Sequence, residues 1–210
     1  MPKRGFFLAI EGTDGVGKST QTKRIAAALT KLGVDVVVTR EPGGTQLGEE
    51  VRKLLKSKGE IGLRAEALLM LGSRAQLCEE LIVPALEKGQ FVISDRFTGS
   101  FYAYQGYGRG LDLTELKQMT DFAISGLVPD LTILLENPNL RSHQPLDQAD
   151  RFESLGKPFL DRVFAGYYAL AQEYGWKIVS SDSDLETITD LLLNVIVEDG
   201  RVNLGDLRVT

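Results

Sequence analysis

The residues with the clearest chemical potential lie between positions 12 and 20. They follow the spacing Gly-x-x-x-x-Gly-Lys-Ser/Thr, directly after an apolar run and at the start of a segment with helical periodicity. Glycines let the backbone curl so that successive N–H groups face a phosphate, and a helix N-terminus adds favourable dipole charge. Lys18 would reach the β- and γ-phosphates, and the Ser19 hydroxyl would bind Mg²⁺. The residues expected to bind a nucleoside triphosphate are Gly12, Thr13, Asp14, Gly15, Val16, Gly17, Lys18, Ser19 and Thr20.

Triphosphate binding alone does not define the reaction. A GTPase switch would carry Asn-Lys-x-Asp for guanine, and this tetrapeptide is absent from the sequence. A motor or helicase would be larger than 210 residues. A small chain with many arginines in its loops is typical of phosphoryl transfer to a small acceptor, where catalysis is mostly positioning and charge neutralisation.

Two further clusters follow predicted strands, where ligands bind in open α/β sheets. Glu41 and Pro42 belong to the first, Thr-Arg-Glu-Pro-Gly-Gly-Thr at positions 39–45. Asp95 and Arg96 form the second, in which the carboxylate would orient Mg²⁺ or its waters and the guanidinium would span both phosphate groups. A plain turn and a strand-end ion pair are the alternative interpretations.

A third cluster combines aromatic rings, an amide and a guanidinium with three glycines, at positions 100–110. Rings stack on a planar base and an amide reads its edge, so this segment is expected to form a base-binding loop. The alternative is aromatic core packing. Arg74 adds a guanidinium within an apolar helical stretch, where a snorkelling surface arginine is the simpler interpretation.

Short apolar runs alternate with helical patterns along the chain, which predicts βαβ units and a mostly parallel sheet buried on both faces. Capping-box spacing predicts that Asp112 with Glu115, and Ser183 with Glu186, open two of the helices. Pro84 is expected to bend or break the longest helical segment. We expect strands at 6–10, 34–39, 91–94, 131–135 and 177–180, and helices at 18–32, 47–55, 65–87, 112–125, 152–174 and 185–197.

Composition excludes several classes of protein. The formal net charge is −5, from 24 Lys and Arg against 29 Asp and Glu, which argues against a general nucleic-acid or anionic-membrane binder. A single Cys and a single His exclude an internal disulfide and a zinc cluster. The apolar runs fall far short of the ~20 residues that span a bilayer, and the N-terminal run is too short for a signal peptide. We therefore expect a cytoplasmic protein.

Five motifs together resemble the thymidylate kinase family: Glu11–Gln21, Thr39–Thr45, Asp95–Arg96, Ala103–Gly110 and Pro129–Thr132. The resemblance extends over residues 6–197. It implies an α/β P-loop NTPase fold, with a five-stranded parallel sheet sandwiched by helices, and the reaction ATP + dTMP → ADP + dTDP with Mg²⁺. It also implies a homodimer. From the negative net charge we expect no nucleic-acid or membrane partner. We expect one kinase domain over 1–200, a lid at about 136–151 and a C-terminal tail at 201–210.

The resemblance also assigns roles to residues of the acceptor side. Arg74 and Gln105 would meet the thymine edge, and Ser100 sits where the family reads the base. Tyr104 would lie under the deoxyribose, where its bulk disfavours a 2′-hydroxyl. On the phosphate side, Asp14 and Glu41 would lie near the acceptor phosphate and the metal, Pro42 beside them, and Arg96 would hold phosphate. Lys18, Asp14 and Arg96 are therefore expected catalytic residues, and Ser19 and Asp95 the metal ligands.

Three positions depart from the family pattern. Met70 occupies the place of an aromatic residue that stacks on thymine, and methionine packs against a ring more loosely. The predicted lid carries only Arg141 and Arg151, and Gly15 stands where members with a poor lid place an arginine. Arg141 or Arg151 would then neutralise the transferring phosphoryl group. Two alternatives stay open: a kinase for another nucleoside monophosphate, or a nucleotide-binding protein with weakened turnover.

Overall fold

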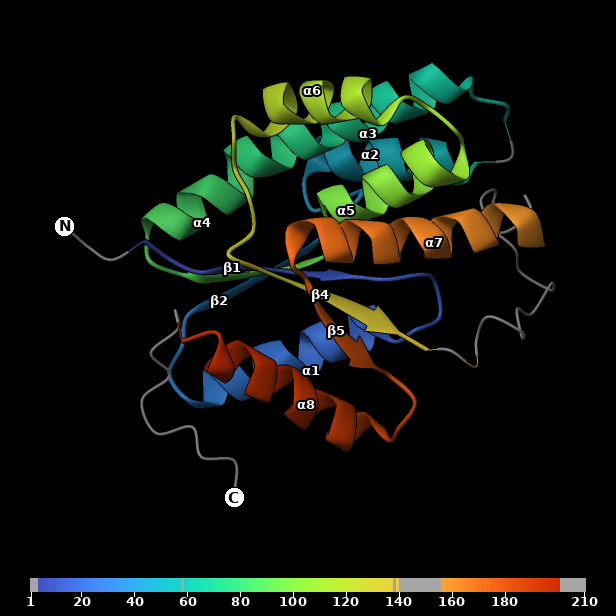
Figure 1. The fold of residues 1–210 in the computed structure, drawn as a ribbon. Helices are drawn as coiled ribbons and strands as arrows, with labels where there is room; N and C mark the ends of the chain where they lie inside the picture. The colour runs from blue at the N-terminus through green and yellow to red at the C-terminus, as the bar shows by residue number, and fades with distance from the viewer. Residues whose placement is uncertain (1–3, 58, 138, 140–155, 201–210) are drawn as a thin grey trace.

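The computed structural model describes residues 4–57, 59–137, 139 and 156–200. A five-stranded sheet forms its centre, in the order β2-β3-β1-β4-β5, and all neighbouring strands are parallel (Figure 1). The predicted parallel sheet is thus confirmed. Its strands are β1 (Phe7–Glu11), β2 (Val36–Arg40), β3 (Phe91–Asp95), β4 (Leu131–Glu136) and β5 (Lys177–Ser180).

Helices cover both faces of the sheet. Helices α1 and α8 cover one face, and the others lie on the opposite face (Figure 1). Apolar cores form on both sides: Ile25 and Leu192 are fully buried on one, Leu77 and Leu116 on the other. The helices are α1 (Lys18–Lys31), α2 (Gln46–Lys56), α3 (Leu63–Leu77), α4 (Val83–Glu87), α5 (Thr98–Phe101), α6 (Leu113–Ile124), α7 (Lys157–Tyr174) and α8 (Leu185–Glu198), with π-helical stretches η1 (Cys78–Ile82) and η2 (Tyr102–Gly108).

The segment predicted to be a loop at 100–110 is helical instead. It runs through α5 and η2, and its side chains pack against α7. Gly108 and Gly166 permit this contact, because a Cβ on the first would press on Phe159 and one on the second on Tyr107. Gly108, which was expected to serve a ligand, therefore allows η2 and α7 to approach each other closely.

Helix boundaries differ from the prediction at three places. The expected break near Pro84 is the π-helical stretch η1, which ends just before α4. Asp112 caps α6 by accepting a hydrogen bond from the Glu115 N–H, as predicted. Asp184, and not Ser183, caps α8. Helix α7 begins at Lys157 instead of residue 152, directly after Gly156.

Across the described residues, no helix is both long enough and apolar enough to cross a membrane. Most of the predicted lid and the whole tail at 201–210 lie outside the described residues. The predicted domain limits therefore stay a prediction.

Candidate active site

The phosphate loop connects β1 to α1. Gly12, Gly15 and Gly17 have φ values of 141°, 81° and 93°, a region that side chains with a Cβ rarely adopt. A Cβ on Gly12 would also collide with the carbonyl of Leu135 on the neighbouring strand. The first turn of α1 carries no acidic residue, so its N–H groups and dipole are left to an anion.

Lys18 lies inside this loop. Only 6% of it is exposed, and its Nζ donates a hydrogen bond to the Thr13 carbonyl at 2.6 Å. Burial lowers the pKa of its ammonium to about 7, and the nearby Arg96 adds to this shift. A bound polyphosphate would supply the negative charge that this buried ammonium lacks.

The two predicted metal ligands lie together. Asp95 ends β3, in register with Ile10 of β1, and the Ser19 hydroxyl at the start of α1 donates a hydrogen bond to its carboxylate. Hydroxyl and carboxylate oxygens are the donors that Mg²⁺ prefers. Among the described residues, no group of three or more His, Cys, Asp or Glu could hold a metal by itself. The pair therefore fits a cation that also takes oxygens from nucleotide phosphates.

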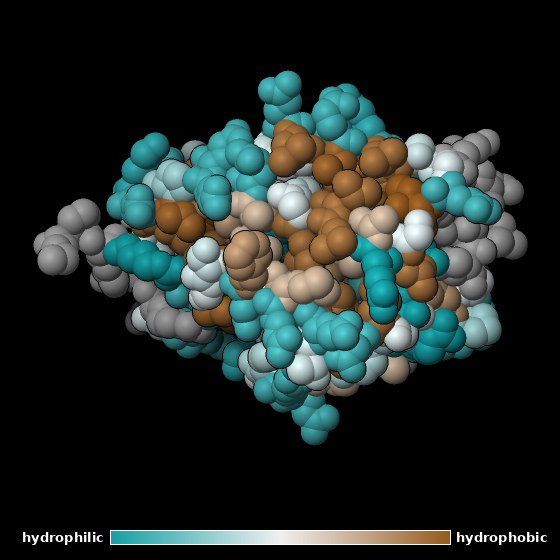
Figure 2. Space-filling model, turned by 90° about the horizontal axis from the view of Figure 1, so that it is seen from above, coloured by the Kyte–Doolittle hydropathy of each residue, from teal (hydrophilic) through white to brown (hydrophobic). Residues whose placement is uncertain are grey.

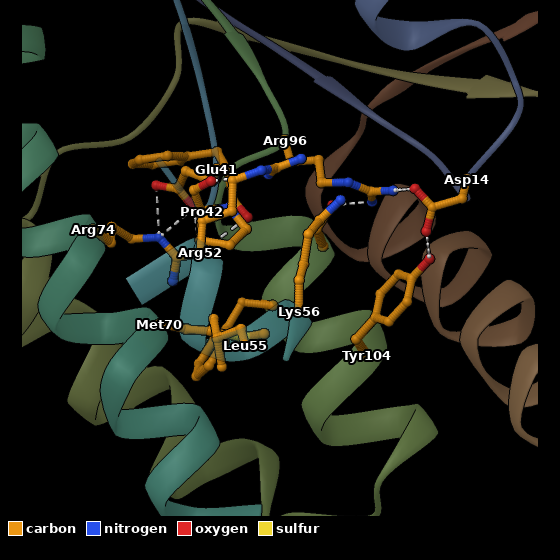
Figure 3. Close-up of a pocket in the computed structure, with 13 residues that line it drawn as sticks. Asp14, Glu41, Pro42, Arg52, Leu55, Lys56, Met70, Arg74, Arg96 and Tyr104 are labelled. Atoms are coloured by element: carbon orange, nitrogen blue, oxygen red, sulfur yellow. Dashed lines mark hydrogen bonds and ion pairs between the residues drawn. The ribbon is translucent and has the colours of Figure 1, made fainter. Parts of the chain in front are cut away.

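Beside the loop lies a cavity, into which side chains from several elements point (Figure 3). Most of the predicted acceptor residues line it. Leu55, Phe97 and Phe101 give it apolar walls, and cationic groups face them. Its full lining is Asp14, Glu41, Pro42, Arg52, Leu55, Lys56, Met70, Arg74, Arg96, Phe97, Ser100, Phe101 and Tyr104.

Arg96 joins this cavity to the phosphate loop. Its Nη1 donates to the carbonyl of Gly12 at 2.8 Å, and its Nη2 donates to Asp14 Oδ1 at 2.7 Å. The guanidinium holds the pKa of the Asp14 carboxyl well below its usual range, with help from Lys18. Arg96 itself has a φ of 73°, a strained backbone conformation of the kind found at functional sites.

Arg74 and Glu41 form a buried ion pair. The Nε of Arg74 donates to the Glu41 carboxylate at 3.0 and 2.9 Å, and its Nη2 donates to the Phe97 carbonyl at 3.2 Å. Nη1 of Arg74 is buried and has no hydrogen-bond partner among the described residues. The Glu41 carboxylate is thus bound by Arg74, and the backbone N–H of Glu41 donates to the Asp95 carbonyl at 3.0 Å.

Gln105 does not line the cavity, although it was expected to meet the base. It is fully buried, and its Nε2 donates to Glu66 Oε1 at 2.9 Å and contacts Met70 Sδ at 3.5 Å. The helical course of η2 turns its amide towards α3. Met70 therefore forms this part of the cavity wall (Figure 3).

Tyr104 and Ser100 do line the cavity. The Tyr104 hydroxyl donates to Asp14 Oδ2 at 3.2 Å, which fixes its ring as a wall next to the phosphate loop. Ser100 accepts from Arg96 Nη1 at 2.9 Å and donates to the buried carboxylate of Glu11. It therefore orients Arg96 as well as facing the cavity.

Sequence reasoning missed the apolar lining residues Leu55, Phe97 and Phe101, and also three polar residues. Arg52 and Lys56 reach the cavity from α2, where they could have been found because they share one helix face with Leu55. Tyr167 of α7 is buried, donates to the Gly12 carbonyl at 3.0 Å and accepts from Arg96 Nη1 at 3.0 Å. No motif in the sequence indicated it. Arg141 and Arg151 lie outside the described residues.

Three features lie at the same edge of the sheet: a glycine-rich phosphate loop after β1, an acidic residue at the end of β3 and a cation-lined acceptor cavity. Together they define a P-loop kinase of the α/β class.

Residues 10–191 match the family model for thymidylate kinase. Thymidylate kinase of Exiguobacterium sp. is 43% identical over 201 residues, which cover 92% of this chain and 95% of that protein. Thymidylate kinase of Parasynechococcus marenigrum is 44% identical over 199 residues, 90% of this chain and 95% of that protein. The crystal structure of thymidylate kinase from Ehrlichia chaffeensis superposes with a TM-score of 0.77 at 31% identity, over 92% of this chain and 99% of that one. The chain belongs to the thymidylate kinase family.

Proposed function

We propose that the protein transfers the γ-phosphoryl group of ATP to dTMP, giving ADP and dTDP, with Mg²⁺. The observation that carries this proposal is the place of Arg96. One guanidinium contacts the phosphate loop through Gly12 and Asp14 and also lines the acceptor cavity. A cation between a donor site and an acceptor site is what phosphoryl transfer needs, because charge is spread over the oxygens of the transferring group.

Residues of the loop would hold the donor. Loop N–H groups and Lys18 would bind the ATP phosphates, and the oxygens of Ser19 and Asp95 would hold Mg²⁺. When bound, Mg²⁺ neutralises charge on the phosphate oxygens. An oxygen of the dTMP phosphate then bonds to the γ-phosphorus while the bond to the bridging oxygen of ADP breaks. Arg96 would stabilise the charge on the acceptor side, and Arg141 or Arg151 would do so from the lid.

Residues of the cavity would select the acceptor. Nη1 of Arg74 is free to donate to a carbonyl of the base, and the rings of Phe97 and Phe101 pack against the Arg74 guanidinium at 5.5 and 5.0 Å. Tyr104 would face the sugar. Met70 in place of an aromatic residue supports a second candidate, a kinase for a different nucleoside monophosphate, because a methionine wall sets the shape of the base less strictly.

The test is a coupled ADP-release assay with dTMP, dUMP, dCMP, dGMP, dAMP and UMP. We expect the highest kcat/KM with dTMP. Faster turnover with another monophosphate would favour the second candidate. Nucleotide binding by calorimetry without product from any of the six would instead indicate a protein that has lost turnover.

The homodimer is part of the same proposal. Figure 2 looks down on the helices of one face and shows apolar side chains gathered there. Leu54 of α2, Leu68 of α3 and Phe122 of α6 are 47%, 58% and 89% exposed. Exposed apolar patches of this kind mark protein–protein contacts. Light scattering on the protein and on its Leu68→Glu variant tests this, with a shift from dimer to monomer expected. The cytoplasmic location stays a prediction from the sequence.

A further inference from the structure

Four cationic side chains line the acceptor cavity, and two of them are neutralised by carboxylates. Arg74 is paired with Glu41 and Arg96 with Asp14. Among the described residues that line the cavity, Glu41 and Asp14 are the only carboxylates, so Arg52 and Lys56 give it an excess of positive charge. Such an excess is suited to binding an anion.

Arg52 and Lys56 lie one turn apart on α2. Like charges at this spacing repel each other and destabilise the helix, and an anion bound beside them would relieve that repulsion. Arg52 is held in place: its Nη1 donates to the Pro42 carbonyl at 3.0 Å, and burial together with the nearby Arg40 lowers its pKa. Lys56 is exposed and has no hydrogen-bond or ion-pair partner within the described part of the chain.

The direction of the Lys56 side chain distinguishes it from an ordinary surface lysine. A lysine in the last turn of a helix can be explained by the helix dipole alone. Figure 3 shows, however, that the Lys56 side chain extends along the cavity towards the Arg96–Asp14 pair. Lys53, on another face of the same helix, pairs instead with Glu50 at 2.7 Å.

We propose that Lys56 is an acceptor-phosphate binding residue, which brings a flexible cation from α2 to the monophosphate opposite Arg96. This inference rests on the proposed function and adds a residue to it. Arg96 is already engaged by Asp14, so a phosphate with up to two negative charges needs further cations. Arg52 and Lys56 each supply one from α2. A lysine on a long stem can follow that phosphate, because its ammonium is a point charge without a fixed geometry.

The test compares Lys56→Met with Lys53→Met. Both remove one positive charge from α2 and keep the apolar stem, but only the first side chain faces the cavity. For Lys56→Met we expect KM for dTMP to rise about three- to tenfold, with kcat and KM for ATP within twofold. Lys53→Met should match the unmodified protein in all three, and Lys56→Arg should retain most of the affinity for dTMP.

Calorimetry separates phosphate binding from a general effect on the cavity. Lys56→Met should weaken dTMP binding and leave thymidine binding unchanged, and the difference should shrink as salt rises. Equal losses for dTMP and thymidine, or an unchanged KM for dTMP in an active enzyme, would overturn the role of Lys56. If the ADP-release assay shows faster turnover with another monophosphate, the calorimetry is repeated with that monophosphate and its nucleoside, and the role of Lys56 is then decided separately from the choice of dTMP. If the protein binds none of the six monophosphates, the proposed function and the role of Lys56 are both overturned.

Discussion

The donor loop and the acceptor cavity bind the same kind of group in different ways. The donor loop is one continuous stretch from Gly12 to Ser19, and it offers mainly backbone N–H groups and a helix N-terminus. The acceptor cavity consists of side chains from α2, α3, α5, η2 and the turns that follow β2 and β3, far apart in the sequence. A backbone cradle depends on local conformation, whereas the cavity depends on the order of strands in the sheet.

The two regions also manage charge differently. Lys18 is a buried cation, and burial lowers its pKa to about 7, so the charged form of this side chain is incompletely compensated by its surroundings. In the cavity, Arg74 and Arg96 already have carboxylate partners. The donor loop is therefore arranged to gain stability when it binds an anion, and the acceptor cavity is largely arranged in advance by its own ion pairs.

The strongest test of this contrast is Lys18→Met. We expect kcat/KM to fall about 10³-fold, since a preorganised cation on the transferring phosphate is lost. The melting temperature should stay the same or rise, because a buried charge close to Arg96 is removed. Lys23→Met, an exposed position of the same helix, is the matched control and should remain fully active. A loss of activity below tenfold would contradict the role of Lys18.

Glu41→Gln tests the ion pairs of the cavity. Removal of one partner of a buried pair leaves Arg74 uncompensated, so the free energy of unfolding should fall by about 3–5 kcal/mol. Glu49→Gln breaks the exposed pair with Arg40 and should cost about 1 kcal/mol or less. Denaturant titration measures both. Calorimetry should show weaker dTMP binding with ATP binding retained, and an equal loss for ATP would remove the distinction between the two regions.

Tyr167→Phe tests the link between the two regions. Its hydroxyl contacts the Gly12 carbonyl, Arg96 Nη1 and Ser100 Oγ at 3.0, 3.0 and 2.8 Å. Without it, Arg96 and the loop lose a shared support, and we expect kcat to fall about tenfold with stability lower by about 1–3 kcal/mol. KM for dTMP should change less than kcat. Tyr174→Phe, at the exposed end of α7, is the control, and a loss of stability with unchanged kcat would make Tyr167 structural only.

The smallest expected effect is the pH dependence of ATP binding. The pKa of Lys18 is about 7 in the free protein, and bound phosphates raise it, so binding takes up a proton above that pH. The affinity for Mg-ATP should therefore fall as pH rises, by roughly fivefold to tenfold between pH 7.5 and 8.5. Calorimetry in buffers of different ionisation enthalpy would show the uptake directly. A pH-independent affinity with no proton uptake would mean that Lys18 is fully charged before ATP binds.

Much of the fold could be predicted from hydrophobic periodicity. All five strands were expected within one or two residues of their observed limits, because buried parallel strands are short apolar runs bounded by glycine, proline or charge. The segment at 100–110 was expected as a loop because of its glycines. One of them, Gly108, instead permits the close packing of η2 on α7, which local sequence does not reveal.

Residues of the site divide in the same way. The phosphate loop and its strand–loop–helix context could be predicted from the sequence alone, because the loop is formed by consecutive backbone groups and by the N-terminus of one helix. The sequence also placed Glu41 and Arg96 at the sheet edge, since parallel strands end together. Three placements follow from packing between distant elements: Gln105 turns away behind Met70, and Lys56 and Tyr167 face the site. Side-chain direction on a helix is set by how that helix packs across the sheet, and this packing depends on residues distant in the chain.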